Sequence, residues 1–348
     1  MRAFYSAKQR DHSPEYFYVA GQQRPTPDVP ERITGLLSGL TADRDEVREP
    51  ADYGLVYVAR VHTPAYLEFL ETASAEWRKL ARATALVTPN VHPRRLGGGY
   101  PSSIVGRAGY HQYDLACPIA SQTWPAVLWN AHTAAAAALF VRDEGAREAY
   151  ALCRPPGHHA GPDFAGGFCY LNNAAVAAEI LRERYRTVAV LDVDVHHGNG
   201  TQEIFYERGD VLCVSLHGDP DGFYPFFWGY AQETGAGAGA GATLNLPLKR
   251  DTGDREYLQA LEVAAARIRA FGAEALVVSL GFDSYEKDPL AWLSITTEGF
   301  AQIAAVIGRL GLPTVLVQEG GYFCEDLGRN LSAFLGAFRA ERLEPAAL

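Results

Sequence analysis

The stretch TVAVLDVDVHHGNG, residues 187–200, joins a short apolar run to a dense set of polar side chains. Its small and β-branched residues are typical of a strand buried in a parallel sheet, and we predict a strand over Thr187–His196. On extended backbone, side chains two residues apart share a face, which places Asp192, Asp194 and His196 together while the intervening valines point into the core. Because buried carboxylates are costly without a counter-charge, this set predicts a bound cation.

Short apolar runs alternate with amphipathic stretches on both sides of this segment, from about residue 149 onward. This alternation is typical of βαβ units, so we predict an α/β fold in which a central, mostly parallel sheet is flanked by helices, with residues 1–348 forming a single domain. The other expected strands are Ala149–Arg154, Val211–His217, Thr243–Leu248, Ala275–Asp283 and Pro313–Glu319. The expected helices are Ala131–Arg142, Asn172–Arg186, Arg255–Phe271, Thr297–Gly308 and Asp326–Arg342.

The first 150 residues are less regular, and residues 85–112 contain Pro, Gly and Arg without a period. Loops of that length inside a compact domain are usually functional or disordered. We interpret 85–112 as a loop insertion that forms a lid or a subunit interface, with a plain surface excursion as the alternative. The GAGAGAGA run at 235–242 lies between two expected strands and is interpreted as a flexible loop.

Charge and composition exclude several classes of protein. The chain has 41 acidic and 31 basic residues, a net charge of −10, whereas a general nucleic-acid binder usually has a basic footprint. No stretch approaches ~18 consecutive apolar residues, and the N-terminal MRAFYSAKQR lacks the apolar segment of a signal peptide. We therefore expect no nucleic-acid partner, no membrane span and a cytoplasmic protein. The five cysteines form no CxxC motif and are expected to be buried apolar residues.

A further acidic residue follows another long apolar strand: in ALVVSLGFD, residues 275–283, Asp283 comes two residues after a glycine. Strand ends of open α/β sheets form the ligand crevice, so Asp283 is expected at the same edge as Asp194 and His196. Two carboxylates and one imidazole match a catalytic zinc, or iron(II), better than a closed structural site, which would favour cysteines. The sequence therefore predicts a catalytic metal centre.

Adjacent histidines follow the CRPPG segment, again just beyond an expected strand. An imidazole titrates near neutral pH, so His158 and His159 are candidates for taking a proton from an attacking water and giving one to a leaving group. Asp192 and Asn199 are candidate orienting partners, and the two rings should differ in basicity because only one of these partners is charged. In EGGY, residues 319–322, paired glycines permit close backbone approach and Tyr322 is placed to polarise a carbonyl.

Five motifs occur together in one order: RPPGHHA, GGFCYLNNAA, DVDVHHGNGTQ, SLGFDS and EGGY. With them, the chain resembles the histone deacetylase and acetylpolyamine amidohydrolase superfamily over roughly residues 12 to 335. The aromatic and Gly-Ala stretch at 218–241 and the 85–112 segment look most similar to the bacterial acetylpolyamine amidohydrolases. The resemblance implies an arginase-like fold with a tunnel leading to zinc.

The resemblance also implies roles for individual residues. Zinc would be held by Asp194, His196 and Asp283, with His158 and His159 as the acid–base pair, Asp192 and Asn199 behind them, and Tyr322 donating to the carbonyl oxygen. A structural potassium ion is expected at Asp192, Asp194, His196, Ser215 and Leu216, and a second one near Phe205, Arg208 and Val211. The tunnel would be lined by Phe168, Tyr224 and Gly167, with Tyr18, Leu290 and Asp114 nearer the rim.

The expected function is hydrolysis of small acetylated amines, such as acetylpolyamines, with release of acetate. The alternatives are deacetylation of acetyl-lysine in peptides or of another small acyl amide, and a binding module without catalysis. Some polyamine-selective relatives carry a glutamate where this chain has Leu290, so Asp114 is the candidate acidic group for a cationic substrate. The 85–112 segment resembles the loop that pairs subunits in the amidohydrolases, so we expect a homodimer.

Overall fold

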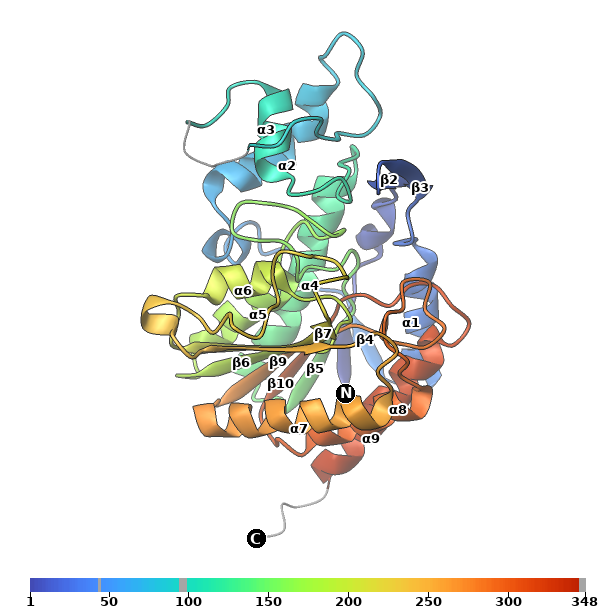
Figure 1. Ribbon diagram of the computed structural model, residues 1–348, viewed down its shortest axis with the longest axis vertical. Coiled ribbons are helices and arrows are strands. Elements are labelled where there is room, and N and C mark those ends of the chain that lie inside the picture. The colour runs from blue at the N-terminus through green and yellow to red at the C-terminus, as the bar shows by residue number, and fades with distance from the viewer. Residues whose placement is uncertain (43–44, 94–98, 344–348) are drawn as a thin grey trace.

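The predicted parallel sheet lies at the centre of the computed structural model, which describes residues 1–42, 45–93 and 99–343 (Figure 1). Its strand order is β4-β1-β5-β10-β9-β6-β7-β8, and every neighbouring pair is parallel. The strands are β1 (Arg2–Phe4), β4 (Glu46–Arg48), β5 (Glu148–Ala151), β6 (Val188–Asp192), β7 (Val211–Gly218), β8 (Thr243–Leu248), β9 (Ala275–Leu280) and β10 (Thr314–Gln318). Strands β2 (Tyr16–Val19) and β3 (Gln22–Pro25) form a separate antiparallel hairpin.

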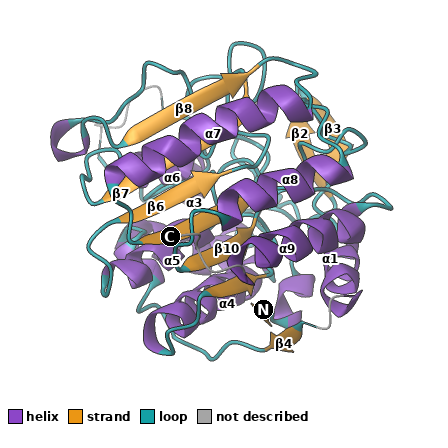
Figure 2. Ribbon diagram, turned by 90° about the horizontal axis from the view of Figure 1, so that it is seen from below, coloured by secondary structure: helices purple, strands orange, loops and turns teal. Residues whose placement is uncertain are grey.

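Helices cover both faces of the sheet, as the apolar strands require. Helices α4 (Thr123–Asp143), α5 (Asn173–Arg182) and α6 (Asn199–Phe205) lie above it in Figure 1. Helices α1 (Glu31–Ala42), α7 (Asp254–Phe271), α8 (Thr297–Gly308) and α9 (Leu327–Leu343) pack on the other face, where Figure 2 shows α7, α8 and α9 running roughly along the strands. Within β6, Val188 and Val190 face the first helical layer, and Ala189 and Leu191 face the second.

All six predicted strands and all five predicted helices are confirmed, with differences at their ends. Strand β6 ends at Asp192, so the prediction of extended strand as far as His196 is wrong, although Val193 and Val195 are buried in the core as expected. The chain leaves the sheet there because Asp194 N donates to Asp192 Oδ1 at 3.0 Å, an interaction that replaces ladder hydrogen bonds.

The 85–112 segment is not a loop throughout. Residues 94–98 lie outside the described part of the chain, but Ile104–His111 form helix α3, which packs on α2 (Pro64–Trp77). Ser103 caps this helix by accepting a hydrogen bond from Gly106 N at 3.1 Å. The helix has only eight residues and includes two glycines, so its pattern was too short to identify from the sequence.

The Gly-Ala run forms the expected loop between β7 and β8, with a short 3₁₀ turn at Gly237–Gly239. Ala236 N donates to Tyr206 O at 2.9 Å, so the loop is anchored to the end of α6. Four of the five cysteines are buried, as predicted, whereas Cys324 is only partly buried. Within the described residues, none of the helices combines the length and apolar composition needed to cross a bilayer.

Candidate active site

The predicted site residues converge at one edge of the sheet, beyond the carboxyl ends of β6, β9 and β10. These three strands are adjacent and parallel, so the segments that follow them emerge side by side. Asp192 ends β6, Asp283 follows β9, and Glu319 follows β10. The prediction that residues far apart in sequence meet at this edge is therefore supported by the topology.

Asp194, His196 and Asp283 bring their ligand atoms to within 4.8 Å of one another. His196 Nδ1 lies 3.2 Å from Asp194 Oδ1 and 3.2 Å from Asp283 Oδ2, and all three side chains are buried. Backbone amides hold the carboxylates in place: Val195 N donates to Asp283 Oδ1 at 3.0 Å and Gly320 N donates to Asp194 Oδ2 at 2.7 Å. The cluster is therefore preorganised by the chain itself.

The charges in this cluster call for a cation. Burial and the neighbouring charge of Asp194 raise the pKa of Asp283. Burial would lower the pKa of His196, but its hydrogen bonds to Asp194 and Asp283 outweigh this and raise it to about 9. Ligands on one tetrahedral zinc with bonds of ~2.1 Å are separated by roughly 3.4 Å, close to the spacing here. Two carboxylates and one imidazole at this spacing fit a catalytic zinc.

His158 and His159 pack against each other beside the cluster, with ring centroids 4.0 Å apart and the ring planes tilted by 44°. His158 Nδ1 lies 2.9 Å from Asp192 Oδ2, and His159 Nδ1 lies 2.7 Å from Asn199 Oδ1, which confirms the predicted pairing with these residues. Burial opposes the charged form of both rings, but the Asp192 carboxylate overcomes it and raises the pKa of His158 to about 10. Burial and the positive charges of His158 and His196 lower the pKa of His159. The rings therefore differ in basicity, as predicted.

Tyr322 is buried and follows a turn that is anchored on several sides. Gly321 has φ 103°, a left-handed conformation that favours glycine. The buried Arg32 donates to Gly321 O and to Glu319 O, each at 2.6 Å. The Glu319 carboxylate accepts from Gly157 N at 2.6 Å and from His158 N at 3.1 Å. Glu319 thus links the turn that carries Tyr322 to the turn that carries the two histidines, a role that the sequence analysis missed.

A cavity of about 580 Å³ leads to these residues, and its wall includes His159, His196 and Tyr322. All six residues predicted for the tunnel line it: Phe168, Tyr224, Gly167, Tyr18, Leu290 and Asp114. A Cβ at Gly167 would lie 2.3 Å from the His159 ring, so only glycine fits there. Phe168 has φ 69°, a costly conformation for a non-glycine residue. Its ring packs edge-to-face on that of Tyr322, with ring centroids 5.9 Å apart.

Asp114 joins two walls of this tunnel. Its Oδ2 accepts from Tyr224 Oη at 2.7 Å and from Gly167 N at 3.0 Å, and its Oδ1 accepts from Ala116 N at 2.8 Å. Burial raises the pKa of this carboxyl. Its oxygens therefore already accept three hydrogen bonds within the protein.

Several wall residues were not identified from the sequence. Phe223 stacks on His196 with ring centroids 4.8 Å apart, and Phe226 and Phe227 are 50% and 71% exposed near the mouth. The other additions are Phe17, Val19, Ala20, Tyr113, Ala116 and Gly222. The aromatic run at 223–230 was the available signal, but nothing in its spacing places it over the sheet edge.

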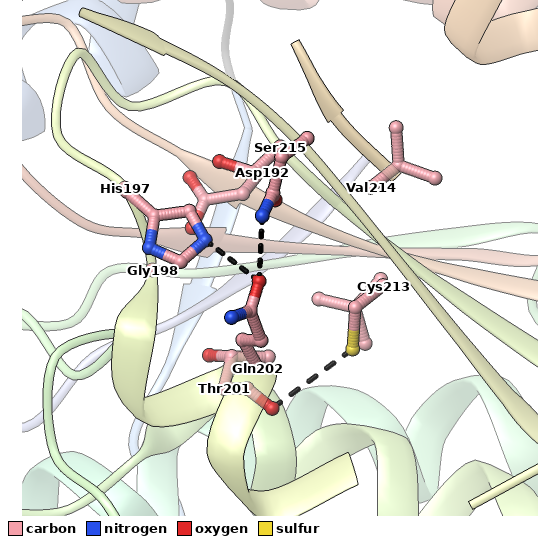
Figure 3. A pocket seen from close by; sticks show the side chains of 10 residues that line it. Asp192, His197, Gly198, Thr201, Gln202, Cys213, Val214 and Ser215 are labelled. Atoms are coloured by element: carbon pink, nitrogen blue, oxygen red, sulfur yellow. Dashed lines mark hydrogen bonds between the residues drawn. The ribbon is translucent and has the colours of Figure 1, made fainter. Parts of the chain in front are cut away.

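A second, small cavity of about 10 Å³, room for roughly one water-sized particle, lies beside Asp192, the hydrogen-bond partner of His158 (Figure 3). Asp192 and Ser215, which are register partners on β6 and β7, both line it, whereas Leu216 is the next residue of β7. The residues predicted for a second ion, Phe205, Arg208 and Val211, lie together where α6 leads into β7. The Arg208 side chain is engaged by Asp210 and Glu179.

Comparison with known proteins supports this arrangement. A model of the histone deacetylase domain matches residues 26–338. The acetylpolyamine amidohydrolase of Burkholderia pseudomallei (strain 1710b) is 46% identical over 98% of this chain and all of its own, and acetylpolyamine amidohydrolase 1 of Pseudomonas aeruginosa is 43% identical over 97% and 100%. A crystal structure of acetylpolyamine aminohydrolase from Burkholderia pseudomallei superposes with a TM-score of 0.95 at 45% identity, covering 98% of this chain and 99% of that one. The chain belongs to the histone deacetylase family.

Proposed function

We propose that this protein is a zinc-dependent amidohydrolase that removes the acetyl group from small acetylated amines such as acetylpolyamines. The observation that carries this proposal is the aromatic tunnel that ends at His159, His196 and Tyr322. Its walls suit an alkyl chain, and its end brings a proton-transfer group and a hydroxyl donor to one point. The names of the relatives support the same substrate class.

Asp194, His196 and Asp283 would hold the zinc ion, or iron(II) in its place. When bound, the metal supplies Lewis-acid polarisation of the amide carbonyl and of the attacking water. A structural potassium ion is proposed at Asp192, Asp194, His196, Ser215 and Leu216. The small cavity beside the Asp192 carboxylate and the Ser215 side chain supports a cation there.

The two histidines have different tasks. His159 lines the tunnel and has a lowered pKa, so its neutral ring can accept a proton from the attacking water. Asn199 Oδ1 accepts from Nδ1 of this ring, which leaves Nε2 as the acceptor and later as the donor to the leaving amine. His158, held as a cation by Asp192, stabilises the negative charge that develops nearby.

Tyr322 completes the site. Its hydroxyl would donate to the carbonyl oxygen as the tetrahedral oxyanion forms, and its ring packs on Phe168 in the tunnel wall. The reaction adds water across the amide C–N bond and yields a free amine and acetate.

One observation favours an acetyl-lysine peptide or another small acyl amide as the substrate. The rim residue Leu290 is apolar, and the Asp114 oxygens already accept three protein hydrogen bonds, so neither group offers a free carboxylate to a cationic amine. We propose a homodimer built through the 85–112 segment as the device that narrows the mouth and excludes bulky proteins. Sedimentation analysis tests the dimer, and fractionation of the source cells tests the cytoplasmic location.

The proposal is tested by giving purified, zinc-loaded protein equal concentrations of acetylputrescine, acetylspermidine and an acetyl-lysine peptide, and measuring acetate release. Faster release from the acetylated polyamines is expected. A faster reaction with the peptide would replace the substrate assignment with the alternative. No release from any of the three would overturn the proposed function.

A further inference from the structure

A buried carboxylate that the proposed mechanism does not use lies beside Tyr322. Asp288 is 7% exposed and sits on the segment after β9, five residues beyond Asp283. Its Oδ2 accepts from Tyr322 N at 2.7 Å, and its Oδ1 accepts from Leu290 N at 2.8 Å. One side chain therefore contacts the backbone of the proposed oxyanion donor and the backbone of a rim residue.

We infer that Asp288 is a positioning residue that fixes Tyr322 against the tunnel rim at Leu290. This inference rests on the proposed function, in which the Tyr322 hydroxyl must meet the developing oxyanion. Asp288 does not touch the reacting atoms, and it acts through the backbone of Tyr322.

The turn before Tyr322 explains why such an anchor is needed. Gly320 and Gly321 precede the tyrosine, and glycine has more conformational freedom than any other residue. Arg32 and Asp194 hydrogen-bond to polar backbone groups of residues 319–321, and the Arg32 guanidinium also lies over the Tyr322 ring, 4.9 Å from its centroid, whereas Asp288 bonds to the Tyr322 backbone. The bond from Tyr322 N to Asp288 is thus the polar contact that holds the tyrosine backbone directly.

The contact to Leu290 gives the anchor a second consequence. An aspartate that accepts from the amide two residues later forms a common local turn, and Asp288 makes this turn to Leu290. The bond to Tyr322 instead spans 34 positions and joins two segments that follow neighbouring strands. A substrate group that contacts Leu290 can therefore alter the position of Tyr322 through the Asp288 carboxylate.

Asp288→Asn and Asp288→Ala, each made in the parent and in a Tyr322→Phe background, test this role. Asparagine keeps one acceptor oxygen but turns an NH₂ group toward one of the two amides, whereas alanine removes both acceptors. We expect Asp288→Ala to lower kcat at least tenfold in the parent and less than twofold once the hydroxyl is absent, with Asp288→Asn between parent and alanine. Equal losses in the two backgrounds would show a purely structural role and overturn the inference, as would an unchanged kcat in the parent.

Hydrogen exchange at the Tyr322 amide supplies a readout that does not depend on turnover or on metal. Exchange should accelerate in Asp288→Ala, and also in Asp288→Asn if the alanine variant fails to fold. The matched control is Asp326→Ala. It removes the bond that Tyr285 Oη, on the same segment as Asp288, donates to Asp326, but it leaves the Tyr322 amide paired with Asp288. Unchanged protection in both Asp288 variants overturns the inference, whereas a parent protein that releases no acetate overturns the proposed function alone.

Discussion

Gly320 N donates a hydrogen bond of 2.7 Å to Asp194 Oδ2, so the turn before Tyr322 directly contacts a candidate metal ligand. The metal ligands also lie close to the position that a side chain of residue 320 would occupy. A Cβ at position 320 would lie 2.0 Å from Asp283 Oδ2 and 2.6 Å from Asp194 Oδ2. The metal cluster and the oxyanion turn therefore have to be built together.

Gly320→Ala is expected to displace the carboxylates of Asp194 and Asp283, because the new Cβ would overlap an oxygen of each. Bound zinc should therefore fall at least tenfold. Zinc per protein after gel filtration and acetate release are the measurements. Gly336→Ala is the control, since a Cβ there meets nothing within 4 Å. A Gly320→Ala protein with full zinc content would contradict the proposed ligand geometry.

Tyr322→Phe should keep the fold and the zinc while kcat falls about 100-fold or more, since loss of one oxyanion donor costs ~3 kcal/mol. Steady-state kinetics with melting temperature and zinc content check this. Tyr66→Phe, which removes a buried bond from α2 to Tyr170 O, should instead lower stability by about 1 kcal/mol and leave the rate alone. An unchanged rate in Tyr322→Phe would remove the tyrosine from the mechanism.

Asn199→Asp should move the acid limb of the pH–rate profile upward. Burial and the charge of His158 keep the pKa of His159 low, so this ring stays neutral and able to accept a proton well below pH 6.5. A carboxylate at position 199 would favour the imidazolium and raise that pKa by about 1–3 units. Activity should then be lost at higher pH than in the parent, in kcat/KM measured from pH 5 to 9. A shift in the opposite direction would exclude His159 as the base.

Leu290→Glu should favour cationic substrates, because it adds a carboxylate to an apolar rim. An exposed ion pair contributes up to about 1 kcal/mol, so kcat/KM for acetylspermidine should rise by up to about fivefold relative to the uncharged N-butylacetamide. The gain should shrink at high salt. Leu290→Gln controls for size and polarity, and an equal gain with glutamine would show that charge is not the cause.

The sheet could be predicted because its central strands are buried on both faces and read as continuous apolar runs. Strands β1 and β4 have three residues each, too few to show a period, and they were missed. The strand order could not be read either, since pairing of β10 with β5 and β9 depends on contacts across most of the chain. Helix α3 was missed for the same reason as the short strands.

The site was partly predictable because parallel strands end at one edge. Asp194, His196 and Asp283 follow strands that were recognised, so their convergence followed from the topology. Phe223 and Phe226 come from an irregular segment, and no periodicity relates such a segment to the metal. Asp288 resembled an ordinary turn residue, because its bond to Tyr322 N depends on how two loops fold over each other.

The place of β10 in the sheet has a consequence for biosynthesis. Strands β4, β1 and β5 are joined to β9, β6, β7 and β8 only through β10, the last strand made. A nascent chain that ends before Thr314 would hold two sheet fragments with open edges, which are prone to association. Pairings this distant along the chain also form slowly. We therefore expect the sheet to close only after β10 has been made, so that chaperones that shield strand edges would raise the yield of folded enzyme.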